Sequence, residues 1–121
     1  MKKEVFGANG GTVSEATVAG GFAFISGQIA WDLETYEVSH GTIEEEARMA
    51  LTNLKTMVEK VGATLDDVVK CDVFLSSMKD FDKMNEVYKE FFGTKCPPAR
   101  CAVALELWGG MKIEIGAIVK L

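Results

Sequence analysis

The sequence is poor in the residues that build most metal and nucleophile sites. It has one histidine, His40, and three cysteines, Cys71, Cys96 and Cys101, which form no Cys-x-x-Cys pair. A zinc site needs a cluster of such ligands, and a catalytic triad needs a histidine beside its nucleophile. We therefore expect no metal site and no protease-type triad. The odd number of cysteines favours free thiols in a reducing compartment over a disulfide framework.

Long apolar runs and basic clusters are also missing. No window approaches the ~18 apolar residues of a membrane-spanning helix, and the first residues lack the apolar stretch of roughly 7–15 residues of a secretory signal. These absences predict a cytoplasmic protein without a membrane partner. The formal net charge is -5 and the pI about 4.9, with lysines scattered along the chain. Such a charge repels a polyanion, so we expect no nucleic-acid partner.

What is present is typical of one globular domain. The chain has 121 residues, of which 48% are hydrophobic and 26% charged. This length is close to the most common domain size, so we expect a single domain over residues 1–121.

Two amphipathic helices are predicted. Thr42 and Glu45 form a capping box before an apolar stripe that runs to Gly62, a typical helix stop. The acidic run at 44–46 suits the first turn of this helix and is not a metal site. A second helix is expected from about Asp80 to Phe92, ended by Gly93.

The strands predict an α+β fold. Glycine pairs at 10–11, 20–21 and 109–110 indicate turns, and β-forming residues indicate strands at about 22–29, 68–75, 100–107 and 112–120. The order is β-β-α-β-α-β-β, a mixed sheet with both helices on one face. The last two strands are expected to form a hairpin around 108–111. The closing strand, 113–119, is apolar at both parities, which indicates burial of the second face against other subunits.

Arg100 is the first candidate site residue. It follows Pro97 and Pro98 and lies in an otherwise apolar strand, where a permanent charge needs a partner. The guanidinium fork matches a carboxylate, so Arg100 is either the anchor for a substrate carboxylate or half of an internal ion pair.

Two further positions are candidates. Glu114, between Ile113 and Ile115, is either a proton donor and acceptor or a glutamate on the solvent face of an edge strand. The segment 26–28, Ser-Gly-Gln, is either a place where a ligand approaches the backbone or a bulge.

Together these elements resemble one family. The segments Ser26–Ile29, Asn85 with Tyr88, Pro98-Ala99-Arg100, and 112–118 are similar in order and spacing to the Rid/YjgF family, also called endoribonuclease L-PSP. The resemblance covers almost the whole chain. It implies a chorismate-mutase-like fold and a homotrimer whose sheets form a central barrel with clefts between subunits.

The resemblance also implies an activity, the hydrolysis of 2-iminobutanoate and 2-iminopropanoate to 2-keto acids and ammonia without a cofactor. Arg100 would hold the substrate carboxylate, and Glu114 would activate water. The remaining cleft residues would be Ser26, Gly27, Asn85, Cys101 and Ala102. A hairpin would leave Arg100 and Glu114 roughly 16 Å apart at ~3.3 Å per residue, which favours a cleft shared by two chains.

Departures from the family keep other functions open. Thr12-Val13-Ser14 stands where the family's deaminases carry a turn with tyrosine, Ala102 replaces a frequent cysteine, and Trp108 replaces a usual proline. Trp31 and Trp108 are expected to pack in the core or an interface, with reshaping of the cleft as the alternative. The alternatives are a non-catalytic trimer that binds small carboxylates as a regulator or chaperone-like protein, and an endoribonuclease or translation inhibitor.

Overall fold

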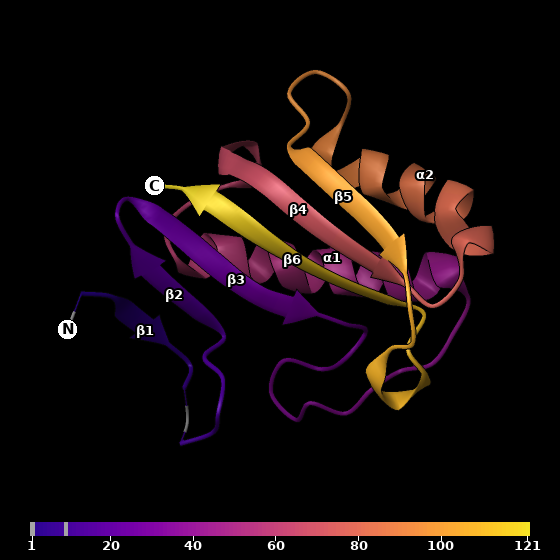
Figure 1. Cartoon of the computed structure of the whole chain (residues 1–121), viewed down its shortest axis with the longest axis horizontal. Helices are drawn as coiled ribbons and strands as arrows, with labels where there is room; N and C mark the ends of the chain where they lie inside the picture. The colour runs from indigo at the N-terminus through magenta and orange to yellow at the C-terminus, as the bar shows by residue number, and fades with distance from the viewer. Residues whose placement is uncertain (1, 9) are drawn as a thin grey trace.

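The computed structural model describes residues 2–8 and 10–121 and builds them around one six-stranded sheet (Figure 1). The helices are α1 (Ile43–Lys60) and α2 (Phe81–Phe92). The strands are β1 (Glu4–Phe6), β2 (Ala16–Ala19), β3 (Phe22–Gln28), β4 (Val68–Leu75), β5 (Ala99–Ala104) and β6 (Ile113–Lys120). The predicted order is confirmed from β2 onward, and the short edge strand β1 is additional.

Local signals set the helix boundaries as predicted. The Thr42 hydroxyl accepts the Glu45 N–H at 3.1 Å, and the Glu45 carboxylate accepts the Thr42 N–H at 2.9 Å. This capping box satisfies two of the free N–H groups at the start of α1. Beyond the helix ends, Gly62 and Gly93 have φ values of 90° and 68°, which glycine adopts without strain. Neither described helix has the length and apolar character needed to cross a bilayer.

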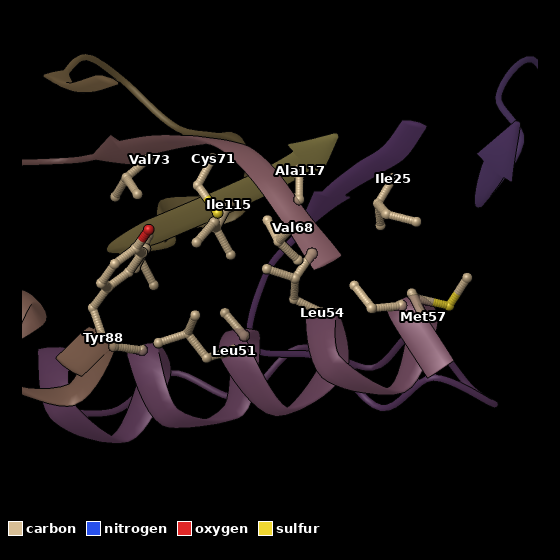
Figure 2. Packing of buried hydrophobic residues seen from close by; sticks show 14 of the residues in the cluster. Ile25, Leu51, Leu54, Met57, Val68, Cys71, Val73, Tyr88, Ile115 and Ala117 are labelled. Carbon is tan, nitrogen blue, oxygen red and sulfur yellow. The ribbon is translucent and has the colours of Figure 1, made fainter. Parts of the chain in front are cut away.

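The core lies between the sheet and the helices, which cover the same face of the sheet (Figure 1). Figure 2 shows Leu51 and Leu54 of α1 directed toward Val68 and Cys71 of β4 and Ile115 of β6. All five side chains are buried. Burying a side chain of leucine size stabilises a fold by about 1.5–3 kcal/mol, so this contact holds α1 on the sheet.

The predicted hairpin of the last two strands is wrong. The strand order is β1-β2-β3-β6-β4-β5, so β4 lies between β5 and β6. Helix α2 connects β4 to β5 as a crossover, which makes these two strands parallel and places β5 at the edge. Residues 105–112 then carry the chain past β4, and β6 pairs antiparallel with both β3 and β4.

The opposite face of the sheet is covered by no other element of the described chain (Figure 1). On β6, Ile113, Ile115, Ala117 and Val119 are buried, while the residues between them face this open side. Phe24 and Val103 remain 43% and 46% exposed. The helices thus account for the apolar residues on one face of β6. Burial of the other face by further subunits stays a prediction.

Candidate active site

Arg100 belongs to β5, and its side chain reaches α2, where three side chains of the helix contact the guanidinium. Its Nη1 donates to Asn85 Oδ1 at 2.7 Å. The guanidinium carbon lies 4.6 Å from the ring centroid of Tyr88 and 5.5 Å from that of Phe81. These contacts fix the direction of the cation, since arginine stacks on aromatic rings.

The internal ion pair considered for Arg100 is not found. Among residues 2–8 and 10–121, the four ion pairs involve other basic residues, and no carboxylate lies within 4.0 Å of the guanidinium. A groove of about 400 Å³ opens beside it, lined also by Asn85, Lys89 and Pro98. Arginine has five N–H donors, and the described contacts engage one of them. The groove therefore offers positive charge and spare donors to a small anion.

Glu114 lies in the middle of the sheet, not on an edge strand. Strand β6 is paired on both sides, by β3 and β4, so the edge-strand interpretation is wrong. The carboxylate rests against Gly27, where an added Cβ would lie 2.7 Å from Glu114 Cδ and Oε2. With any larger residue at this position the Glu114 carboxylate would have to move from its present place.

Gly27 lies within an irregularity of β3. The pairing with β6 shifts between Ile25 and Gln28, so the bulge interpretation of the segment 26–28 is confirmed. The Ser26 hydroxyl donates to the carbonyl of Ser14 at 2.6 Å, which ties the bulge to the loop before β2. Bulges re-aim side chains and are frequent beside active sites.

A second cavity, of about 310 Å³, borders this bulge. Its lining includes Val13, Ser26, Gly27, Trp31 and Tyr36. Val13, at the position of the family tyrosine, is 72% exposed at this cavity. The structure thus gathers Ser26 and Gly27 beside Glu114, and Asn85 beside Arg100.

Cys101 and Ala102 divide between the two faces of the sheet. They pair with Asp72 and Val73 of β4, respectively. Ala102 packs against the core on the side of Arg100, whereas Cys101 is exposed. Because side chains alternate along a strand, the Cys101 thiol points to the open face, as Glu114 does.

Arg100 and Glu114 are far apart in one chain. Glu114 is in register with Phe74, which is in register with Val103, three residues beyond Arg100. Two strand spacings of ~4.8 Å and three residues of ~3.3 Å separate the two Cα atoms by about 14 Å. The side chains also point to opposite faces. One chain therefore does not bring both charges to one small ligand. The sequence predicted this separation, but from a hairpin that the structure does not contain.

The two tryptophans have different environments. Trp31 is partly buried: it packs against the small cluster of Ile29, Ala30 and Met111, as expected, and it also lines the cavity at Gly27. Trp108 is 70% exposed, so core packing is wrong for it. Its turn is held by a hydrogen bond between His40 Nε2 and the carbonyl of Gly109 at 2.7 Å.

Sequence reasoning missed Tyr36, which lies beside the Gly27 cavity. The Tyr36 hydroxyl donates to Glu15 Oε1 at 2.5 Å, and Lys60 Nζ donates to Glu15 Oε2 at 2.9 Å. These two donors hold the pKa of the Glu15 carboxyl below its usual range, and the same carboxylate raises the pKa of Tyr36. The unusual tyrosine in a polar turn was the only signal in the sequence.

No group of three histidine, cysteine or acidic side chains close enough to hold a metal ion occurs in the described parts of the chain. Among the cysteines, burial raises the pKa of Cys71 to about 11. A thiol with this pKa stays protonated near neutral pH and is a poor nucleophile.

The fold and the site residues define a small α+β protein with a groove beside the Arg100 guanidinium and a separate carboxylate, Glu114. Residues 7–121 match the model of the family described as Endoribonuclease L-PSP. The chain therefore belongs to this family, the Rid/YjgF family, as its motifs predict.

Similar proteins agree with this membership. A RutC family protein of Pyrococcus horikoshii is 45% identical over 98% of this chain and 97% of its own length. A 2-iminobutanoate/2-iminopropanoate deaminase of Dermatophagoides farinae is 38% identical over 90% of this chain and 85% of its own. The crystal structure of Escherichia coli TdcF with bound serine has a TM-score of 0.82 and 33% identity, and the match covers 92% of this chain and 89% of TdcF.

Proposed function

We propose that this protein hydrolyses 2-imino acids such as 2-iminobutanoate and 2-iminopropanoate to 2-keto acids and ammonia. The observation that carries the proposal is the environment of Arg100. Its guanidinium is held by Asn85 and by aromatic rings, has no carboxylate partner in the described chain, and borders an open groove. A positioned arginine of this kind matches the carboxylate that every 2-imino acid carries.

The second catalytic residue is Glu114. Water adds to the imine carbon and forms a C–O bond, while Glu114 accepts a proton from the water. Glu114 passes this proton to the nitrogen, and the C–N bond then breaks as the new hydroxyl group returns its own proton to Glu114. The carbonyl of the 2-keto acid forms and ammonia leaves. The protonated imine carbon is electrophilic by itself, so this mechanism uses no cofactor. In this proposal Ser26, Gly27 and Asn85 line the cleft. The backbone around Cys101 and Ala102 contacts the ligand.

The cleft in this proposal is formed by two copies of the chain. Arg100 and Glu114 point to opposite faces of one sheet, so a small substrate reaches both only where the Arg100 half of one copy meets the Glu114 half of another. The exposed apolar side chains on the open face, such as Phe24 and Val103, fit a homotrimer in which these faces meet. Activity then depends on assembly.

One alternative is favoured by a specific observation. Val13 leaves the cavity at Gly27 without the tyrosine hydroxyl of the family's deaminases, which fits a non-catalytic protein that binds small carboxylates. The presence of Glu114 argues against a purely carboxylate-binding protein, because a carboxylate near the ligand weakens anion binding. The family description also names endoribonucleases. A net charge of -5 opposes RNA binding, so RNA cleavage is an outcome to test, not the proposal.

The test is a coupled assay. A threonine dehydratase generates the enamine, and the decay of the imine is followed with wild type, Arg100→Ala and Arg48→Ala. Arg48 is a matched control, since it pairs with Glu90 on the helix surface at 2.8 Å, outside the site. We expect wild type and Arg48→Ala to accelerate the decay and Arg100→Ala to lose the acceleration. A folded wild type that accelerates nothing would overturn the proposal in favour of carboxylate binding.

A further inference from the structure

Trp31 and Tyr36 form an aromatic pair in the loop after β3. Their ring centroids lie 5.0 Å apart at an interplanar angle of 72°, an edge-to-face contact. The loop folds back on itself, because Trp31 bridges to Val38 and the Tyr36 N–H donates to the carbonyl of Asp32 at 2.8 Å. The pair is therefore a fixed part of the surface.

Tyr36 has a backbone conformation that its residue type disfavours. Its φ is 60°, and it is the one non-glycine residue with a positive φ in the described parts of the chain. For a bulky side chain this left-handed conformation is strained, and such residues are frequent at ligand sites. A glycine would occupy the position without strain, so the aromatic ring itself needs an explanation.

The hydroxyl of Tyr36 is already engaged. It donates its proton to Glu15, whose carboxylate also binds Lys60. Both donors lower the pKa of Glu15, so at neutral pH the carboxylate is ionised and keeps the hydroxyl directed toward it. Glu15 also lines the cavity, so the hydroxyl is committed to a neighbouring side chain and the ring is the part of Tyr36 that remains to contact a ligand.

The cavity beside this ring adjoins the proposed reaction centre. The two aromatic residues and Val13 line it together with Gly27, and Gly27 is the residue against which the Glu114 carboxylate rests. Its volume of about 310 Å³ is roughly ten times the ~30 Å³ share of a water molecule, which is close to the size of a methyl group. A methyl or ethyl side chain would leave most of this space empty.

We propose that Trp31, Tyr36 and Val13 form the pocket for the substrate side chain and make the protein selective for 2-imino acids with large apolar side chains. This inference rests on the proposed function and names its substrate class. The imine derived from leucine fits this pocket better than the imine derived from alanine. Each additional buried methylene is worth at least about tenfold in kcat/KM when a pocket accommodates it.

The experiment compares two imines produced by the same L-amino acid oxidase, one from leucine and one from alanine. The unhydrolysed imine is trapped with semicarbazide, and kcat/KM is obtained from the loss of trapped product. The enzymes are wild type, Tyr36→Gly and Tyr36→Phe. Glycine suits the φ of 60° at this position, so the first variant removes the ring without straining the backbone. Phenylalanine keeps the ring and removes only the hydroxyl.

We expect wild type to prefer the leucine imine by about tenfold or more. Tyr36→Gly should bring the ratio of the two kcat/KM values close to one, and Tyr36→Phe should keep the preference. Equal values for the two imines in wild type, or an unchanged ratio in Tyr36→Gly, would overturn the inference. If wild type accelerates neither imine, the proposed function itself has failed, which is a different result.

Discussion

Replacing Gly27 with alanine tests how closely the position of Glu114 controls the reaction. The added methyl carbon would lie 2.7 Å from Cδ and Oε2 of Glu114, whereas ordinary contacts begin at 3.4 Å. The carboxylate must therefore retreat by about 0.7 Å. Since a displacement of ~1 Å at a catalytic group can cost ~100-fold, we expect kcat/KM for 2-iminobutanoate to fall about 10- to 100-fold.

The stability of the Gly27→Ala variant should change little. Glu114 is only partly buried and its side chain can rotate, so we expect a loss in the free energy of unfolding of about 1 kcal/mol or less. Gly41→Ala is the matched control, because its methyl group would lie 3.1 Å from Glu45 Oε1, outside the site. The control should keep wild-type kcat/KM. A Gly27→Ala protein that is as active as wild type would refute the role given to the Glu114 carboxylate.

Two further predictions concern the helix start and the buried thiol. Thr42→Ala removes the hydroxyl that accepts the Glu45 N–H, so urea unfolding should show a loss of about 1 kcal/mol in the free energy of unfolding. The control is Thr52→Ala, whose hydroxyl donates to a carbonyl within α1 and whose loss should change the stability less. Equal losses in the two variants would contradict the capping argument. Burial and a pKa of about 11 should keep Cys71 unreactive toward a disulfide reagent in the native protein. Cys96 is exposed and should react at once. Labelling of both thiols at the same rate would contradict the buried position of Cys71.

The helices were predictable because their signals are local. Thr42, Glu45 and Gly62 mark the ends of one helix within a short stretch of sequence, and hydrogen bonds between near neighbours decide the outcome. Strand order is not local in this way. The short connection after β5 is typical of a hairpin, which is why β5 and β6 were expected to pair. In the structure, the crossover through α2 places β5 at the edge of the sheet beside β4, and β6 lies between β3 and β4.

The candidate site was predictable only in part. Arg100 stood out because a permanent charge in an apolar strand needs an explanation, and the family resemblance supplied Asn85, its hydrogen-bond partner. Tyr36 was missed because its significance lies in a backbone angle and in a contact with Glu15, 21 residues earlier, neither of which a sequence pattern displays. The opposite orientation of Arg100 and Glu114 followed only from the register of three strands.

The measurement that tests the shared cleft most directly is complementation between two inactive variants. Arg100→Ala and Glu114→Gln are co-expressed in equal amounts and purified as mixed assemblies. If each cleft takes its arginine from one copy and its glutamate from the next, random mixing leaves roughly one cleft in four with both residues intact. We predict roughly a quarter of wild-type imine hydrolysis in the mixture and almost none in either variant alone. A mixture as inactive as its components would contradict the account, because both residues would then have to act from the same chain.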